Sequence, residues 1–264
     1  MQNNHIPIYS DEDFSYMRRS GSLAAEILDK LKAIIKPGIS TLEINDFCHD
    51  MIVDNNAIPA PLNYKGFPKS ICTSVNHVVC HGIPNENKIL QDGDIINVDI
   101  TVILDGWYGD SSRMFAAGKI NKKVYSLLKT TYECLMIGIK NSMPGKHLGD
   151  IGYEIQKYAE QNGFSVVRDF CGHGIGKDFH TPPSVLHYGN KGEGPELKRG
   201  MFFTIEPMIN LGDWETKILA DGWTAVTKDK SLSAQFEHTI GITNEGNEIF
   251  TLSHNNLDFP INQL

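Results

Sequence analysis

The sequence lacks the marks of a disulfide-stapled or membrane-spanning protein. Its five cysteines are an odd number and include no C-x-x-C pair, which argues against a disulfide framework and a structural zinc finger. No apolar run approaches the roughly 20 residues that a membrane-spanning helix needs. We therefore expect reduced thiols, mostly buried as small apolar side chains, at Cys48, Cys72, Cys80, Cys134 and Cys171.

Basic charge is also scarce. The chain has 24 Lys and Arg against 32 Asp and Glu, a net charge of -8, so DNA is not an expected partner. The opening MQNNHIPIYSDEDF has neither the basic start nor the apolar core of a secretory signal. These features predict a cytoplasmic protein without a membrane association.

What the sequence does contain is a regular alternation of helical and strand patterns. Apolar residues at helical spacing predict four helices, over Ser10 to a stop at Pro37-Gly38, Ser40 to about Asn55, about Lys122 to Lys140 and about Leu148 to Gln161. Apolar and β-branched runs predict strands at Ile71–Val79, Asp94–Leu104, Met201–Ile209 and Glu237–Thr243. The pair Asp105-Gly106 predicts a two-residue hairpin turn after the second of these strands.

The pattern of the first half returns in the second. Pro37-Gly38 recurs as Pro144-Gly145, and the interval from Gly93 to Asp99 recurs as Gly200 to Glu206, at the same offset of 107 residues. We expect a single domain over 1–264, of class α/β (α+β), with two pseudo-symmetric halves of helix–helix–strand plan at about 10–118 and 119–250.

Two acids lie close together in the predicted hairpin. A two-residue turn at Asp105-Gly106 places Thr101 opposite Asp110, and Asp99 shares the face of Thr101 because strand side chains alternate. Asp99 and Asp110 are then diagonal neighbours, roughly 7–8 Å apart. An acid within an apolar strand needs a partner, and a metal ion is one.

Further candidate ligands come from the second half. Glu206 and Glu237 lie in or beside apolar strands, and His173 lies among glycines in CGHGIG, where the backbone can approach a ligand closely. Taken singly, each such residue is more often structural. Together they make a set too acidic for a single zinc ion, and they favour two divalent ions bridged by carboxylates.

The segments that carry these residues resemble the methionine aminopeptidases, in the short type I form of bacteria and organelles. They are SVNHVVCHGIP, GDIINVDITVILDGWYGDSSRMF, CGHGIG with FH after it, FTIEPM, DGWTAVTKD and SAQFEHT. The ordered H, D, D, H, E and E are typical of the wider aminopeptidase, prolidase and creatinase superfamily, while VCHGIP and DGWT favour the methionine branch. The resemblance implies a pita-bread fold and removal of the N-terminal methionine from new proteins.

The resemblance also implies roles for individual residues. A dinuclear site would be held by Asp99, Asp110, His173, Glu206 and Glu237, with Asp110 and Glu237 bridging two ions of Co, Mn, Fe, Zn or Ni. A metal-bridged hydroxide would attack the peptide carbonyl. The catalytic residues would be Glu206 as proton shuttle, His180 as donor to the tetrahedral intermediate and His81 as contact to the scissile amide.

Substrate specificity would come from an apolar pocket. Its implied residues are Tyr64, Phe67, Cys72, Phe179 and Trp223, with His81 and His180 also contacting substrate. Pro61 and Phe67 depart from the cysteine and tyrosine common in bacterial relatives, and both keep the pocket apolar. A small second residue is expected in the substrate. Backbone carbonyls of Asn76, Val78 and Ser233 match the family's monovalent-cation site.

The implied partners are nascent polypeptides, with transient ribosome association open and a monomer expected. Three alternative functions remain. A proline-directed peptidase of the same fold usually carries a large N-terminal domain, a binding protein of this fold loses metal ligands, and a dinuclear phosphohydrolase needs a basic phosphate clamp.

Overall fold

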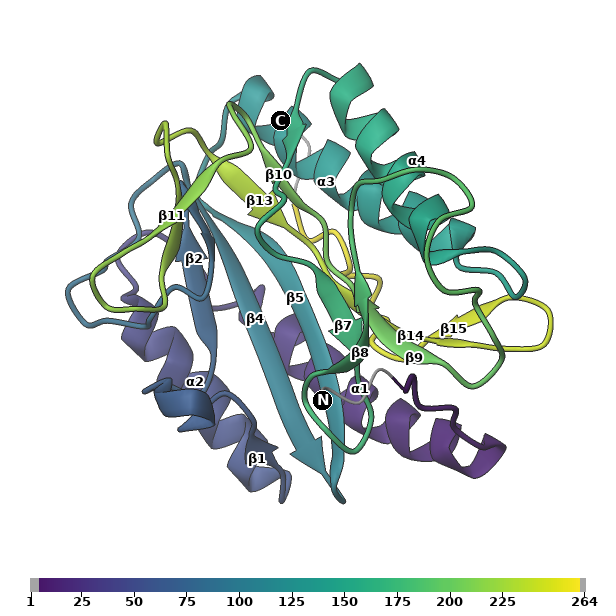
Figure 1. Ribbon diagram of the computed structural model, residues 1–264. Helices are drawn as coiled ribbons and strands as arrows, with labels where there is room; N and C mark the ends of the chain where they lie inside the picture. Colours follow the sequence, from purple (N-terminus) through teal and green to yellow (C-terminus); the bar gives the residue numbers. More distant parts are fainter. Residues whose placement is uncertain (1–4, 262–264) are drawn as a thin grey trace.

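The computed structural model describes residues 5–261 and is a mixed α/β structure (Figure 1). The helices are α1 (Asp11–Leu31), α2 (Thr41–Asp54), α3 (Lys122–Asn141) and α4 (Leu148–Gln161), with a short 3-10 turn, η1 (Tyr64–Gly66). The strands are β1 (Ile58–Pro59), β2 (Cys72–Val75), β3 (Val78–Cys80), β4 (Asp94–Leu104), β5 (Trp107–Ala117), β6 (Ser165–Val166), β7 (Gly172–Gly174), β8 (Thr181–Val185), β9 (Phe202–Ile205), β10 (Met208–Asn210), β11 (Thr216–Ile218), β12 (Ala225–Thr227), β13 (Ser233–Gln235), β14 (His238–Ile242) and β15 (Asn247–Ile249).

The strands form four small sheets. Two carry the site: one has the order β1-β4-β2 with β5 paired to β4, and the other has the order β15-β14-β9-β7-β8. The remaining sheets are β13-β10-β6 and β11-β12-β3. In Figure 1 the strands run through the middle of the molecule, between the α1–α2 pair and the α3–α4 pair.

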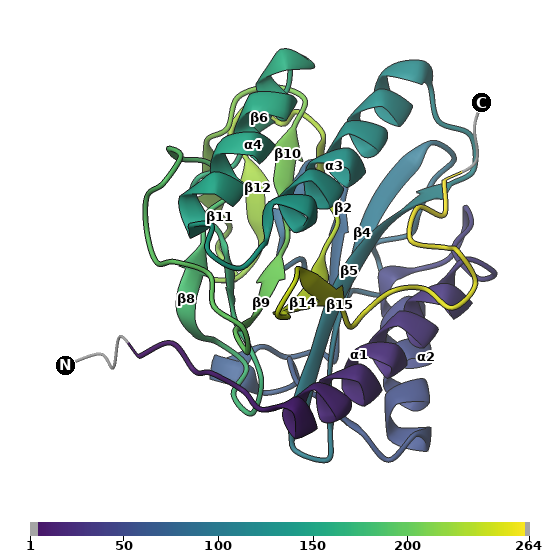
Figure 2. The ribbon, with the colours of Figure 1, turned by 90° about the vertical axis from the view of Figure 1, so that its right-hand side faces the viewer.

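Each helix pair packs its apolar face on strands. One buried cluster joins α1 and α2 to β4 and β5 through residues such as Ile27, Ile44 and Val98. A second joins α3 and α4 to β9 and β14 through residues such as Leu128 and Ile151. Figure 2, turned by 90°, shows the two helix pairs on separate sides of the strands. Each half of the chain therefore supplies one helix pair, which packs on strands of that half.

The repeat seen in the sequence recurs in the hydrogen bonds. Gly38 N donates to Leu90 O at 2.8 Å, and Gly145 N donates to Leu197 O at 2.9 Å. Both ends of α2 lie 107 residues before the corresponding ends of α4. Each of these two helices also begins with a capping box, at Ser40 in α2 and at His147 in α4. The two halves therefore share their local plan, as the sequence predicts.

The hairpin between β4 and β5 has the predicted turn and register. Asp105 and Gly106 have φ of 52° and 80°, and a two-residue turn of this kind needs positive φ at both positions. Leu104 pairs with Trp107, and Thr101 pairs with Asp110. Glycine adopts such a φ at little cost, whereas another side chain at the second position would be strained.

Three predicted boundaries are wrong. The first helix ends at Leu31, several residues before the stop expected at Pro37-Gly38. The expected strand Ile71–Val79 is broken at Asn76-His77, where its two pieces, β2 and β3, join different sheets. The expected strand Met201–Ile209 is likewise broken at Glu206-Pro207. In both cases one continuous apolar run in the sequence contains two strands that belong to different sheets.

All five cysteines are free, and four are buried, with Cys171 half-buried. This confirms the expectation of reduced thiols. Within the part of the chain that the structure describes, no helix is both long enough and apolar enough to span a membrane.

Candidate active site

A cavity of about 960 Å³ is lined by every catalytic, metal-binding and substrate-binding residue that the sequence singles out. Its walls include Tyr64, Phe67, Cys72, His81, Asp99, Asp110, His173, Phe179, His180, Glu206, Trp223 and Glu237. These residues come from both halves of the chain, some from strands and some from the segments between them. The fold therefore gathers into one place residues that are up to 173 positions apart (Tyr64 to Glu237).

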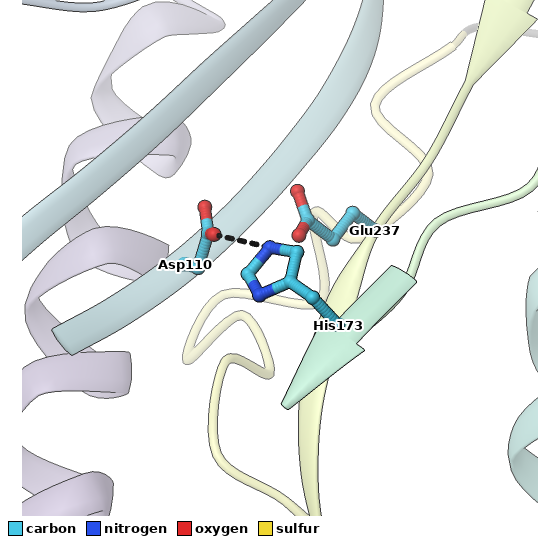
Figure 3. A group of neighbouring side chains, drawn as sticks. All are labelled: Asp110, His173 and Glu237. Carbon is cyan, nitrogen blue, oxygen red and sulfur yellow. Dashed lines mark ion pairs between the residues drawn. The ribbon is translucent and has the colours of Figure 1, made fainter. Parts of the chain in front are cut away.

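Three ligand candidates in the cavity wall form a tight group (Figure 3). One ligand atom from each of Asp110, His173 and Glu237 lies within 4.8 Å of the others. His173 Nε2 is 3.5 Å from Asp110 Oδ2 and 3.7 Å from Glu206 Oε1. Asp110 and Glu237 are each only 3% exposed. The half-buried Asp99 lies diagonally across the hairpin from Asp110, opposite Ser112.

The local structure aims these side chains inward. His173 Nδ1 is 3.1 Å from the carbonyl oxygen of Gly174, to which it can donate, leaving Nε2 to face the carboxylates. This is the ring orientation that a metal-ligating histidine normally has. Glu206 follows the last residue of β9, and Glu237 precedes the first residue of β14. The antiparallel pairing of β9 with β14 therefore sets the two glutamates side by side.

Three polar residues that the sequence reasoning missed hold the carboxylates. Thr101 Oγ1 donates to Asp110 Oδ1 at 2.7 Å. Thr204 Oγ1 donates to Glu206 Oε1 at 2.7 Å, and Gln235 Nε2 donates to Glu206 Oε2 at 3.2 Å. The hairpin register places Thr101 opposite Asp110, so that contact could have been predicted. Nothing in the sequence points to Gln235, which reaches Glu206 from another sheet.

Burial and mutual repulsion dominate the electrostatics of the site. Burial raises the pKa of Asp99 well above its usual value, and the charges of Asp110 and Glu206 raise it further. Burial, then Asp110, likewise raises the pKa of Glu237. Burial raises the pKa of Glu206 to about 7, against the opposing effect of His173. Carboxylates in this state bind protons when nothing positive lies between them.

The donor set fits divalent metal ions. Carboxylate oxygens and one imidazole nitrogen suit first-row divalent metals, and no thiolate belongs to the tight group. Burial lowers the pKa of His173, but the hydrogen bond that its ring donates to Asp110 and the negative charge of Glu206 outweigh burial and raise it. Positive charge is thus favoured at this point in the cavity.

His180 lies next to His173 of this group and contacts the aromatic residue Tyr64. Its Nδ1 is 3.0 Å from the hydroxyl of Tyr64, and its ring centroid is 4.1 Å from that of His173. Phe179 packs against both Tyr64 and His180, at centroid distances of 4.8 and 4.2 Å. Burial, then the charge of His173, lowers the pKa of His180 to about 4, so its ring is neutral at physiological pH.

An apolar wall stands on the other side of the cavity. Phe67 and Trp223 meet edge to face with centroids 5.2 Å apart. His81 meets Phe170 at 5.5 Å and Trp223 at 6.2 Å, and burial lowers the pKa of His81. The sequence reasoning missed Phe170. The predicted pocket residues thus form two groups, one around Trp223 and one around His180.

The residues matched to a monovalent-cation site also come together. Ser233 N donates to the carbonyl oxygen of Asn76 at 2.9 Å, and Val78 opens the neighbouring strand β3. One lone pair of the Asn76 carbonyl is therefore already used. The chain brings these backbone groups together, and whether they bind a cation stays a prediction.

Comparisons with known proteins identify the family to which this chain belongs. The model of metallopeptidase family M24 matches residues 15–244. A methionine aminopeptidase of Rickettsia prowazekii (strain Madrid E) is 60% identical over 256 residues, covering 97% of this chain and 98% of the relative. A crystal structure of methionine aminopeptidase from that organism superposes with a TM-score of 0.93 over 94% of this chain and 100% of its own. A prolidase from Pyrococcus horikoshii OT3 is 18% identical with a TM-score of 0.74, covering 94% of this chain and 64% of its own, and so shares the fold.

Proposed function

The chain belongs to metallopeptidase family M24, and we propose that it is a methionine aminopeptidase, which hydrolyses the bond after an N-terminal methionine. The observation that carries this proposal is the juxtaposition of two features in one cavity. The buried group of Asp110, His173 and Glu237 lies beside an apolar wall built by Phe67 and Trp223. A peptide end with an apolar side chain would find both a hydrolytic centre and a pocket there.

The proposed metal site uses five ligands. Asp99, Asp110, His173, Glu206 and Glu237 would hold two divalent ions, with Asp110 and Glu237 shared between them, Asp99 on one side and His173 with Glu206 on the other. The raised pKa values of Asp99 and Glu237 support this, because such carboxylates gain most from a positive neighbour. When bound, the ions would act as Lewis acids and make a water molecule more acidic. Co, Mn, Fe, Zn and Ni all suit these donors.

The proton transfers fall to the chain's own residues. A carboxyl group with a pKa of about 7 takes up and releases protons readily near neutral pH, which suits Glu206 as the shuttle from the attacking water to the leaving amine. Neutral His180 accepts from Tyr64 at Nδ1, so its Nε2–H can donate to the developing oxyanion. His81 lies at the edge of the apolar wall, where it can contact the scissile amide.

The methionine side chain would pack among aromatic rings. Phe67, Cys72 and Trp223 provide the apolar surface, and Tyr64 and Phe179 close the cavity beside His180. A thioether sulfur gains about 0.3–1.5 kcal/mol from a contact with an aromatic ring. A small second residue is proposed, because the Tyr64–His180 pair stands next to the metal ligands and leaves little room there.

The remaining parts of the proposal concern the whole chain. Residues 1–264 would form a single catalytic domain with halves at about 10–118 and 119–250. Metal ligands from both halves support this, since neither half alone contains the full set. We further propose a cytoplasmic monomer that acts on nascent chains, with transient association with the ribosome and a monovalent cation near Asn76, Val78 and Ser233.

Two of the three rival functions lack a feature that they need. A non-enzymatic binding protein of this fold would have lost metal ligands, whereas all five are present and face one cavity. A phosphohydrolase would use basic side chains as a phosphate clamp, and among the described residues only Lys65 is a basic residue of the cavity wall other than histidine. A proline-directed peptidase is compatible with the fold, because a prolidase shares it, so the assay must test this rival directly.

The decisive experiment is hydrolysis of Met-Ala-Ser by metal-stripped protein to which Co, Mn, Fe, Zn or Ni is returned singly. Metal-dependent release of free methionine is the expected result. Ala-Pro and a phosphoester are assayed beside it with the same protein. No release of methionine with any metal, from protein whose fold is verified by circular dichroism, would overturn the proposal.

A further inference from the structure

The imidazole of His187 is a buried group that the proposed mechanism leaves unused. His187 follows β8, is 1% exposed and does not line the cavity. Its Nε2 accepts a hydrogen bond from the backbone N–H of Glu206 at 3.1 Å. A ring with an accepting Nε2 carries its proton on Nδ1. The geometry therefore defines both the partner and the tautomer of this histidine.

Glu206 lies where the chain changes sheets, so its N–H needs an acceptor outside the strand ladder. Strand β9 ends at Ile205, which pairs with His238 of β14. Pro207 follows with no N–H, and β10 then pairs in a different sheet. His187 supplies the acceptor at this break. The carboxylate of Glu206 is held independently, by Thr204 and Gln235.

Helix α4 packs closely against the segment that contains His187. A Cβ on Gly152 would lie 2.4 Å from the carbonyl oxygen of Tyr188 and 2.7 Å from that of Leu186, so the helix and the segment are in close backbone contact. Gly189 N also donates to Gln156 Oε1 at 3.2 Å. Helix α4 therefore holds the backbone on either side of His187 in place.

Stability alone does not account for a histidine here. Nδ1 of His187 has no hydrogen-bond partner among the residues that the structure describes. A buried donor without a partner destabilises the folded state, and an apolar side chain of similar size would avoid that cost. What such a side chain would lack is the acceptor for Glu206.

We infer that His187 is a positioning residue: by accepting the N–H of Glu206 it fixes the backbone from which that carboxylate reaches His173. The inference rests on the proposed function, in which Glu206 is both a metal ligand and the proton shuttle. Because the effect passes through Glu206, we expect changes in kcat and in metal affinity and little change in KM.

Three substitutions separate this role from simple packing. His187→Gln places an amide oxygen near the position of Nε2 and keeps the acceptor. His187→Asn places its oxygen near Nδ1, and His187→Leu has no acceptor at all. We expect the Gln variant to stay within about twofold of the unmutated protein, and the Asn and Leu variants to lose about tenfold in kcat and in metal affinity, as is usual when a partner of a metal ligand is removed. Metal affinity is measured by calorimetry on stripped protein, and kcat with Met-Ala-Ser on the metal-loaded form.

The outcomes are distinct. A Leu variant with unchanged kcat and metal affinity, or a Gln variant as impaired as the Leu variant, would overturn the inference. If a variant does not fold, the ring ¹⁵N shifts of His187 in the unmutated, metal-loaded protein still test it, since a protonated Nε2 contradicts the assigned geometry. If the unmutated protein releases no methionine with any metal, the proposed function fails, while metal affinity and ring shifts still report on His187.

Discussion

At the scale of single residues, the hydroxyl of Thr101 is the clearest support of a metal ligand in the site. It donates to Asp110 Oδ1 at 2.7 Å from a position that is 1% exposed. A hydrogen bond to a charged group contributes about 1.5–3 kcal/mol, and outer partners of metal ligands typically change metal affinity by 10–100-fold. If Asp110 is a metal ligand as proposed, Thr101 should affect metal binding through this hydrogen bond.

We predict that Thr101→Val weakens metal binding by at least about tenfold, because Asp110 loses the donor that orients it. Thr101→Ser keeps the hydroxyl and serves as the matched control, with an affinity near that of the unmutated protein. Titration calorimetry on stripped protein measures both. Equal affinities for the Val and Ser variants would show that the hydrogen bond does not matter to the site.

His180 gives the second prediction at this scale. We expect His180→Ala to lower kcat by roughly 10²–10³, as the loss of an oxyanion donor does, with metal content unchanged. Tyr64→Phe, which removes the hydroxyl that contacts Nδ1 and keeps the ring, should have a smaller effect. Metal content is measured by atomic absorption beside the kinetics. An Ala variant with normal turnover contradicts the role given to His180.

At the scale of secondary-structure elements, the β4–β5 hairpin sets the geometry of the acids. Its turn has Gly106 at φ 80°, a conformation that costs other residues about 1–2 kcal/mol. Because eleven residue pairs fix the register between Asp94 and Ala117, a strained turn should lower stability without displacing Asp110.

We therefore predict that Gly106→Ala lowers the free energy of unfolding by about 1–2 kcal/mol and leaves metal affinity unchanged. The control is Asp105→Asn, since asparagine also tolerates positive φ. Urea unfolding and calorimetry give the two quantities. A Gly106→Ala variant with weakened metal binding would mean that the turn, and not the ladder, holds the register.

How much the sequence predicts differs from element to element. The strand Asp94–Leu104 was predicted at both ends, since β-branched residues fill it and Asp105-Gly106 ends it. The breaks at Asn76-His77 and Glu206-Pro207 were not predicted, because apolar periodicity does not say to which sheet a residue belongs. The acids were identifiable because charge within an apolar strand is unusual. Gln235, Phe170 and His187 reach the site region through tertiary packing, which local pattern does not encode.

At the scale of the whole molecule, a buried ion pair ties the C-terminal segment to the first half. Arg113 of β5 and Asp29 of α1 form a salt bridge between their side chains, which are 1% and 2% exposed. Ser253 Oγ and Asn255 Nδ2 also donate to Asp29, at 2.9 and 2.8 Å. Burial alone would raise the pKa of Asp29, but its hydrogen bonds with Arg113, Asn255 and Ser253 outweigh burial and lower it.

We predict that Asp29→Asn destabilises the protein by up to about 3–5 kcal/mol at neutral pH, because buried Arg113 loses its nearer counter-ion and keeps only Asp258, at 3.5 Å. A carboxyl group whose pKa is lower in the folded state stabilises above its unfolded pKa of about 3.9, and this contribution disappears as pH falls through that value toward the folded pKa. The gap between unmutated and Asp29→Asn protein should therefore narrow below about pH 4.

Urea unfolding of both proteins at neutral pH and at steps down through pH 4 measures this gap. Comparing the two proteins at each pH cancels the titration of the metal-site carboxylates, which both contain. A gap that stays constant or widens as the pH falls would show that the ionised form of Asp29 is not what stabilises the fold.

The depth of the metal ligands has a consequence for when a substrate can be processed. With Asp110 and Glu237 almost fully covered, only a slender, extended strand of polypeptide can bring its first peptide bond to them. A terminus that is already packed into the tertiary structure of its own protein would not fit into the cavity. If the proposed metal ions bind here, an N-terminus can be trimmed only while it is unfolded, before it packs into the tertiary structure of the substrate protein.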